Sequence, residues 1–148
     1  MTIDSNMWDY PLPFTMKTTV AAEDIDGLNH TNNTVYVKWC EQVAWAHSVA
    51  LGLDLNSYRS LNRAMVITHA DYHYLKASHK GQKLVAATWI TQSDKRVTMK
   101  RHFQIIRIED NATLLRADMR FACIDLASGR PRRMPQEFID GYGGAVIC

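Results

Sequence analysis

The sequence is poor in cysteine, has no long apolar run and carries little excess of either charge. Its three cysteines are widely spaced: Cys40, Cys123 and Cys148. An odd, scattered set of this kind favours neither a disulfide framework nor a Cys-x-x-Cys metal site. No stretch approaches the roughly 18 apolar residues that a membrane-spanning helix needs. These absences indicate a cytoplasmic protein with free thiols and no membrane partner.

Charge and composition argue against three further classes of protein: nucleic-acid-binding, secreted and disordered proteins. The formal net charge is +2, whereas a nucleic-acid-binding domain more often has a basic stripe and a pI above ~9. The N-terminal segment, MTIDSNMWDYPLPF, lacks the basic region and the apolar run of a signal peptide. Hydrophobic residues make up 47% and charged residues 22% of the chain, which argues against disorder. We therefore expect one folded domain over residues 1–148, with no nucleic-acid partner.

One long helix is predicted over residues 34–51, because apolar side chains recur there at spacings of three and four residues. The recurring residues are Val35, Trp39, Val43, Ala46 and Ala50. Asn32, Asn33 or Thr34 can cap the start of this helix, and Gly52 can end it.

The rest of the chain is predicted to form strands. Residues 1–13 should be an irregular arm, since Pro11 and Pro13 break regular structure. Strands are expected over residues 14–23, 64–75, 83–92, 96–108 and 114–125. Short connections make the last four a meander of antiparallel strands, and the one long crossover must lay its helix on a sheet face. The simplest architecture is α+β, an antiparallel five-strand sheet wrapped around one long central helix.

Polar chemistry is concentrated just before that helix, in the segment DIDGLNHTNN over residues 24–33. Acids and asparagines cluster in turns for local reasons, but Asp26 precedes a helix start by only a few residues. Helix N-termini offer free N–H groups and the positive end of a dipole. A carboxylate such as Asp26 can activate water or attack a carbonyl, while amides near Asn33 hold a developing oxyanion. This arrangement favours a hydrolytic site.

Other candidate chemistry is weaker. A lone loop histidine such as His30 is more often a surface residue or cap partner than a catalyst. Asp26 and His30 could suggest a metal, but zinc sites use at least three protein ligands, so we expect none. Cys40 lacks a neighbouring base and should pack in the core. Three arginines in SGRPRRMP form a basic turn that could contact phosphate: Arg130, Arg132 and Arg133.

The segment DIDGLNHTNNTVYVKWCEQVAWAHSVALG, residues 24–52, resembles the signature of hotdog-fold acyl-CoA thioesterases of the 4-hydroxybenzoyl-CoA thioesterase-like family. That signature runs from a strand through Asp-x-Asp, Gly-His-Val-Asn-Asn and Tyr into the central helix, which ends at Leu-Gly. Residues 71–90 are similar to the next segment of the family, and residues 126–135 resemble its closing turn. The resemblance covers roughly residues 14–135.

This resemblance implies an acyl-CoA thioesterase that cleaves a fatty or aromatic acyl-CoA, with Asp26 as general base or nucleophile. His30 and Asn33 stand at catalytic loop-helix positions. Six further residues are expected to bind substrate, the basic ones through CoA phosphates: Asn32, Tyr36, Lys76, Arg130, Arg132 and Arg133. The family needs no metal or redox cofactor, and its sites lie between the subunits of homodimers, which often pair into homotetramers.

The chain departs from the family pattern at several positions. Asn29 replaces the usual Gly, Thr31 the usual Val, Ala77 a frequent Pro and Gln82 a frequent Asp. A plant acyl-carrier-protein thioesterase pattern also tolerates a residue other than Gly at the first of these, but it has Asn where this chain has Leu28. Two other interpretations of the function stay open. One is a hotdog dehydratase or hydratase, which would need an acid–histidine pair, and the other is a non-catalytic acyl-thioester binder.

The strands carry more large apolar side chains than one helix can cover. They include Trp89, Ile90, Phe103, Ile105, Ile106, Ile108 and Phe121. Because large exposed apolar patches usually mark an interface, the sequence predicts an obligate homodimer. Pairing at a sheet edge would also remove the open edge of the sheet.

Overall fold

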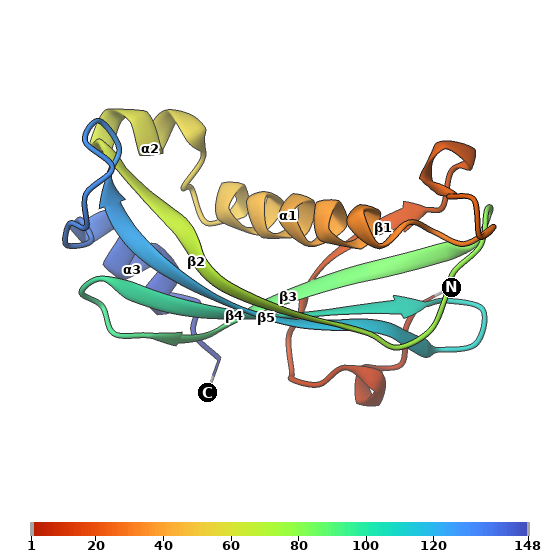
Figure 1. Cartoon of the computed structure of the whole chain (residues 1–148). Helices are drawn as coiled ribbons and strands as arrows, with labels where there is room; N and C mark the ends of the chain where they lie inside the picture. The colour runs from red at the N-terminus through yellow and green to blue at the C-terminus, as the bar shows by residue number, and fades with distance from the viewer. Residues whose placement is uncertain (1, 148) are drawn as a thin grey trace. The chain divides into compact units, whose positions relative to one another are not determined.

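The computed structural model describes residues 2–147. Figure 1 labels the α-helices and the strands; with the two short 3-10 helices η1 and η2, the elements run in the order η1 Ser5–Met7, β1 Phe14–Thr19, η2 Ala22–Asp24, α1 Asn33–Ala50, α2 Leu55–Leu61, β2 Arg63–Tyr74, β3 Lys83–Ser93, β4 Thr98–Arg107, β5 Ala112–Asp125 and α3 Gln136–Gly144. The strands form a five-stranded sheet in the order β1-β3-β4-β5-β2, and a helix packs against it. The predicted α+β hotdog architecture is confirmed.

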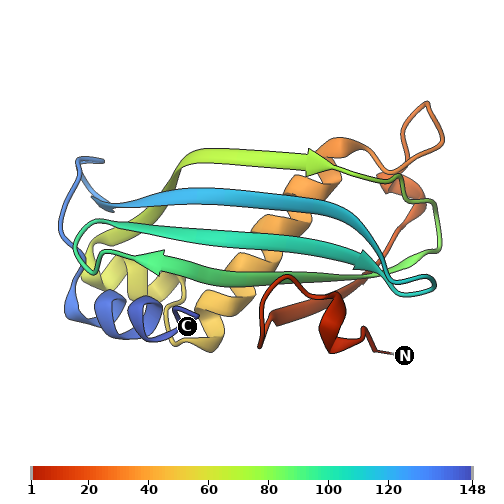
Figure 2. The same ribbon diagram turned by 90° about the horizontal axis from the view of Figure 1, so that it is seen from below.

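The order of the strands differs from a simple meander. In Figure 2 the blue β5 lies between the yellow-green β2 and the teal β4. Thus β3, β4 and β5 are consecutive neighbours, but β2 joins the sheet beside β5 rather than beside β3. The reason is the connection: tight turns follow β3 and β4, whereas a longer loop over residues 75–82 separates β2 from β3. The strand β1 pairs antiparallel with β3, with Phe14 opposite Thr88.

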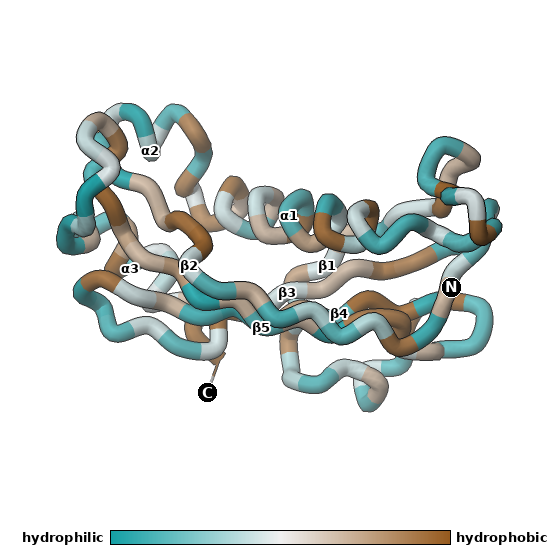
Figure 3. Tube along the Cα trace, in the orientation of Figure 1, coloured by the Kyte–Doolittle hydropathy of each residue, from teal (hydrophilic) through white to brown (hydrophobic). Residues whose placement is uncertain are grey.

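Helix α1 begins one residue earlier than predicted and ends one residue earlier. Polar and apolar segments alternate along it (Figure 3). Its buried side is made of Tyr36, Trp39, Cys40, Val43 and Ser48, so the expected apolar series was right at Trp39 and Val43 but wrong at the exposed Ala50. Cys40 packs in the core as predicted, and burial raises the pKa of its thiol to about 12.

The chain divides into two compact units. The first contains residues 1–44, 72–88 and 103–117, and the second contains residues 45–71, 89–102 and 118–148. The expectation of a single domain therefore stays a prediction.

In the first unit, the N-terminal arm is tied to β4 and β5. The Asp9 N–H donates to Gln104 Oε1 over 2.9 Å, and Gln104 Nε2 donates to the Met7 carbonyl over 3.0 Å. Arg116 also forms an ion pair with the Asp9 carboxylate. The predicted irregular arm contains the short 3-10 turn η1, and a fully buried Gln104 fixes it in place.

The second unit contains two helices that the sequence pattern did not reveal. Helix α2 is short, and the Asp54 carboxylate caps it by accepting the Ser57 N–H over 2.8 Å. Helix α3 contains three glycines, which weaken any helical signal. One of them, Gly141, packs closely, because a Cβ there would lie 2.7 Å from Leu53 Cδ1, so the Leu53 side chain would have to move. Phe138 of α3 is buried against Tyr58 of α2.

The large apolar side chains of the strands are mostly buried within this single chain. Six of the seven named above are under 9% exposed: Trp89, Ile90, Phe103, Ile105, Ile106 and Phe121. In the second unit the chain after α3 adds to the sheet, with Val146 bridged to Ile90. The argument for a dimer from unburied strand residues is therefore wrong, although the dimer itself stays a prediction.

Candidate functional site

The loop between η2 and α1 folds into a tight hairpin in the first unit. Ile25 and Thr31 form an antiparallel bridge. Inside it, the Asp26 N–H donates to the His30 carbonyl, and the Asn29 N–H donates to the Asp26 carbonyl, each over 3.0 Å. The predicted acid and histidine are thus brought side by side along the backbone of one short loop.

The two acids of the loop have different roles. The Asp24 carboxylate accepts the Ala21 N–H over 2.8 Å, and the Asp24 carbonyl accepts the Asn32 N–H over 2.8 Å. Asp24 is therefore a structural residue of the turn. Asp26 is half-buried, and its Oδ1 accepts the Leu28 N–H over 2.9 Å. A single local bond holds one oxygen of this carboxylate, and the other has no hydrogen-bond donor among residues 2–147.

Asn29 explains how the loop tolerates the loss of the family glycine. Its φ is +62°, in the left-handed region. Glycine adopts this region without strain, and Asn is among the few other residues that visit it routinely. The substitution therefore keeps the backbone conformation that the loop requires.

The N-terminus of α1 lies directly after this hairpin. Asn32 caps the helix, because its Oδ1 accepts the Thr34 N–H over 2.9 Å and the Thr34 hydroxyl over 2.8 Å. Asn33 is the first helical residue, and its N–H has no acceptor among residues 2–147. This free donor at the positive end of the helix is suited to an oxyanion. A substrate-binding role for Asn32 stays a prediction.

A second histidine, which the sequence did not suggest, joins the loop. The His79 ring lies edge-on to the exposed His30 ring, with 5.1 Å between ring centroids. His79 Nδ1 lies 3.2 Å from the Asn29 carbonyl oxygen. Because a carbonyl can only accept, Nδ1 carries the proton in this contact. The signal was absent because His79 comes from loop 75–82, far away in the sequence.

Buried hydroxyl groups connect the same two loops. Ser78, which is fully buried, lies 2.6 Å from the Thr31 hydroxyl and 2.6 Å from the Tyr36 hydroxyl, measured between oxygens. The Thr31 N–H also donates to the Ser78 carbonyl over 2.9 Å. Tyr36, which was expected to bind substrate, is only 3% exposed. That role stays a prediction for Tyr36, and Ser78 was missed altogether.

Lys76 is exposed on loop 75–82 of the same unit. Arg107 of β4 fixes this loop by donating to the Ala77 carbonyl over 2.9 Å. The rest of the Arg107 guanidinium is held by the Asp110 carboxylate through two bonds of 2.9 and 2.8 Å. The hydrogen bonds from Arg107 lower the pKa of the Asp110 carboxyl to about 2.

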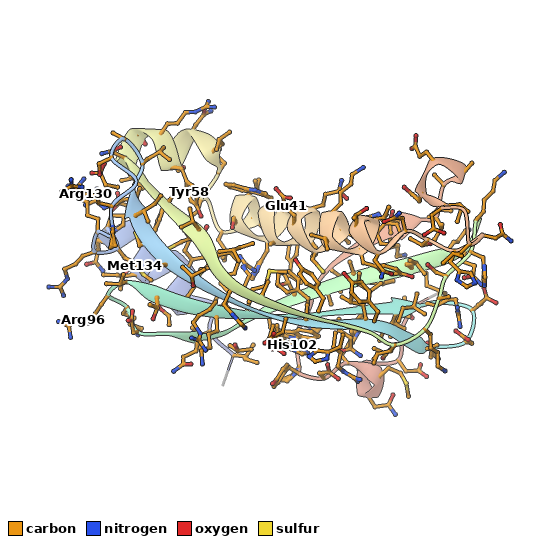
Figure 4. All side chains as sticks on the ribbon, in the orientation of Figure 1. Glu41, Tyr58, Arg96, His102, Arg130 and Met134 are labelled. Atoms are coloured by element: carbon orange, nitrogen blue, oxygen red, sulfur yellow. The ribbon has the colours of Figure 1, made fainter. Side chains whose placement is uncertain are left out.

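The three predicted phosphate-binding arginines lie in the second unit, in the turn that follows β5. Arg132 Nη1 lies 2.8 Å from Asp125 Oδ2. The Asp125 carboxylate also accepts the Ser128 N–H, and these bonds lower its pKa to about 2. Arg130 and Arg133 make no ion pair within residues 2–147. Figure 4 labels Arg130 on this exposed turn.

Between residues 2 and 147, no group of three or more His, Cys, Asp or Glu side chains could hold a metal ion. No helix in the same range is both long and apolar enough to cross a membrane.

The fold is that of the hotdog-fold thioesterases. Residues 20–141 match the family model described as the Thioesterase-like superfamily, and the chain belongs to this superfamily. The predicted resemblance and the predicted enzyme class, a thioester hydrolase, are confirmed. No curated protein matches the sequence.

Solved structures share the fold at low sequence identity. A 1,4-dihydroxy-2-naphthoyl-CoA thioesterase from Synechocystis is 22% identical with a TM-score of 0.79, over 89% of this chain and 96% of that one. A hypothetical Staphylococcus aureus protein in complex with CoA is 20% identical with a TM-score of 0.82, over 94% and 89%. A 12:0-ACP thioesterase from Umbellularia californica is 14% identical with a TM-score of 0.81, over 94% and 55%.

Proposed function

We propose that this thioester hydrolase cleaves a fatty or aromatic acyl-CoA to the free acid and CoA, with Asp26 as general base or nucleophile. The observation that carries the proposal is the hairpin closed by the Ile25–Thr31 bridge. The hairpin carries the half-buried Asp26 carboxylate, and α1, whose first residue Asn33 has a free N–H, begins two residues after it. An acid and an oxyanion donor are the two groups that acyl transfer needs.

In the general-base route, Asp26 accepts a proton from water while the water oxygen attacks the thioester carbonyl carbon. The carbonyl oxygen becomes an oxyanion, and the Asn33 N–H donates to it. The tetrahedral intermediate then breaks its carbon–sulfur bond, and the proton held by Asp26 passes to the CoA thiolate. One thioester and one water give one acid and one thiol.

In the nucleophilic route, Asp26 itself attacks the carbonyl carbon and expels the thiolate, which leaves a mixed anhydride that water hydrolyses. The Leu28 N–H on Oδ1 would orient the carboxylate in either route. We assign His30 to the same site, because its carbonyl accepts the Asp26 N–H and its side chain is exposed.

CoA is the proposed acyl carrier. Support comes from two similar structures, a naphthoyl-CoA thioesterase and a protein in complex with CoA. Asn32 and Tyr36 would contact the acyl thioester. The basic side chains proposed for the CoA phosphates are Lys76, Arg130, Arg132 and Arg133, because ammonium and guanidinium groups bind phosphate oxygens.

Two alternatives compete with hydrolysis. A dehydratase or hydratase needs a carboxylate and an imidazole placed to move a proton at the substrate Cα. Within residues 2–147, no hydrogen bond joins a carboxylate to either imidazole ring of this loop region, His30 or His79. A non-catalytic binder would not need a carboxylate in the hairpin at all, so Asp26 favours an enzyme.

A thiol-release assay with a panel of acyl-CoA substrates tests the proposal. Hydrolysis releases a free thiol in a one-to-one ratio with the carboxylic acid. Hydration of an enoyl-CoA leaves the thioester intact, so a change in substrate absorbance without thiol release would identify a hydratase. Binding of acyl-CoA without turnover would identify a non-catalytic binder.

A further inference from the structure

We infer that Ser78 is a positioning residue for thioester cleavage, which holds the Asp26 loop in register with the first turn of α1. This inference rests on the proposed function of Asp26 and Asn33. Ser78 comes from loop 75–82 and is separated by 47 residues from Thr31. Its side chain is fully buried.

The contacts of Ser78 reach both sides of the site. Its carbonyl accepts the Thr31 N–H, and its hydroxyl meets the hydroxyls of Thr31 and Tyr36. Thr31 lies between His30, which pairs with the Asp26 backbone, and Asn32, which caps α1. Tyr36 lies on the first turn of α1. One buried residue therefore forms hydrogen bonds both to the hairpin that carries the acid and to the helix that carries the proposed oxyanion donor.

Three hydroxyls share this network. The Thr31 hydroxyl lies 3.2 Å from the Ser78 carbonyl oxygen and 2.6 Å from the Ser78 hydroxyl oxygen, so it can donate to either one. The Ser78 hydroxyl also meets the Tyr36 hydroxyl over 2.6 Å, and either group of that pair can donate. Each hydroxyl therefore has a partner, and no buried side-chain nitrogen or oxygen of the described residues lacks one.

This closed network depends on one departure of the chain from the family pattern, because Thr31, which supplies one of its hydroxyls, replaces the usual Val. A Val at position 31 would remove one of the two hydroxyls that the buried Ser78 hydroxyl meets, and the loss of a partner by a buried polar group is costly. The two residues are therefore matched to one another, and changing one alone should displace the hairpin.

Thr31→Val tests the inference, because Val has nearly the shape of Thr but no hydroxyl. We expect Thr31→Val and Ser78→Ala each to lower kcat ~10- to 100-fold, as small displacements of catalytic groups do, with KM changed less than about twofold. The double variant should be no slower than the slower single variant, because the network is already broken. Thr31→Ser keeps the hydroxyl and should restore most of kcat. All variants are assayed below their melting temperatures.

Hydrogen exchange of a peptide that covers residues 24–36 gives a readout that does not need turnover. We expect faster exchange in Thr31→Val than in Thr31→Ser. If Thr31→Val is folded and keeps the wild-type kcat and exchange rate, Ser78 does not position the site. If the wild-type protein releases no thiol from any acyl-CoA, the proposed function fails. The exchange rates then still decide whether Ser78 anchors the hairpin.

Discussion

The backbone N–H of Asp26 donates a hydrogen bond of 3.0 Å to the carbonyl oxygen of His30. This bond lies inside the Ile25–Thr31 bridge and helps to close the hairpin that precedes helix α1. The next two residues bond to different segments. The Thr31 N–H donates to a carbonyl of loop 75–82, and the Asn32 N–H donates to the Asp24 carbonyl. The hairpin is therefore fixed from both sides, while the Asp26 carboxylate keeps one oxygen for chemistry.

Replacing Asp26 by Asn removes the charge and keeps the shape of the side chain. The Asn side-chain oxygen can still accept the Leu28 N–H, so the variant should fold normally. General-base catalysis contributes ~10²–10⁴-fold, so Asp26→Asn should lose at least ~10²-fold in kcat. Asp24→Asn is the matched control, since Asp24 has only structural bonds in this loop, and its kcat should stay near that of the wild type. Near-full kcat in Asp26→Asn would end the assignment of this residue.

Replacing Asn33 by Pro tests the oxyanion donor. Asn33 is the first residue of α1, a position that tolerates proline because the N–H there makes no helical bond. Asn33→Pro should therefore keep the helix but lose the donor, at a cost of ~10²–10³-fold in kcat. Asn33→Ala keeps the N–H, so its kcat should exceed that of the proline variant by this factor. Equal kcat in the two folded variants would show that this amide does not meet the substrate.

The candidate-site residues that are neighbours in the sequence could be predicted, whereas those that reach the hairpin from a distant segment were missed. Asp26, Asn32 and Asn33 could be found because turn chemistry and helix capping act over a few residues. Ser78 and His79 could not, since they contact the hairpin from across 47 and 50 residues of chain. A single serine in a loop carries no pattern that reveals a buried hydroxyl network. Only the fold brings it to Thr31.

The arginine turn should affect binding rather than chemistry. Phosphates of CoA are remote from the reacting carbon, so contacts to them lower KM without raising kcat. A hydrogen bond to a charged group contributes ~1.5 kcal/mol or more, so Arg130→Gln and Arg133→Gln should each raise KM for acyl-CoA roughly tenfold. Arg96→Gln, on the turn after β3 and labelled in Figure 4, is the control.

A short thioester without the nucleotide separates binding to phosphate from damage to the acyl site. Its KM should be unaffected by Arg130→Gln and Arg133→Gln. Arg132 is expected to behave differently, because its guanidinium also holds Asp125, so its loss should lower the melting temperature as well. Equal KM increases for both substrates would contradict the phosphate assignment.

His47 should make stability depend on pH. Arg101 Nη1 lies 3.0 Å from His47 Nδ1, and a guanidinium can only donate, so Nδ1 must accept and stay unprotonated. Burial, with the nearby Arg101 charge, lowers the pKa of His47 from 6.5 to about 4. Between these values the unfolded chain binds a proton that the folded chain does not. Stability should therefore fall as the pH drops from 6.5 to about 4, and this contribution ends below 4.

Urea unfolding at pH 7 and pH 5 measures this effect. His47→Asn keeps an oxygen that can accept from Arg101 but cannot be protonated in this range, so its loss of stability between the two pH values should be smaller than that of the wild type. An equal pH dependence in wild type and His47→Asn would contradict the role of this residue.

The fold was predictable where the sequence pattern is long. Helix α1 and the four longer strands each extend over ten or more residues, which is long enough for apolar spacing and strand-forming composition to reveal them. Helix α2 spans only Leu55–Leu61, and α3 contains three glycines, one of which, Gly141, packs closely against Leu53. The place of β2 beside β5 depends on the path of loop 75–82, which local patterns do not specify. The cytoplasmic location stays a prediction.

Strand β2 is the element through which we expect two chains to pair. It is an edge strand of 12 residues, and an exposed apolar edge is a template for pairing with another chain. Ile67 is 51% exposed and Tyr74 is 43% exposed on it. The opposite edge strand, β1, is half as long, with 6 residues. These features favour a homodimer formed through β2, which could pair further into a homotetramer.

Sedimentation at micromolar concentration measures the assembly. The wild-type protein should sediment at twice the chain mass of 16.9 kDa or at a further multiple of it. Ile67→Lys places a charge on the exposed edge and should shift the protein toward monomer, with loss of activity if the site needs both subunits. Leu55→Lys, a similarly exposed position on α2, should leave the assembly intact. A stable and fully active wild-type monomer would contradict both the interface and the shared site, because obligate dimers rarely have a stable folded monomer.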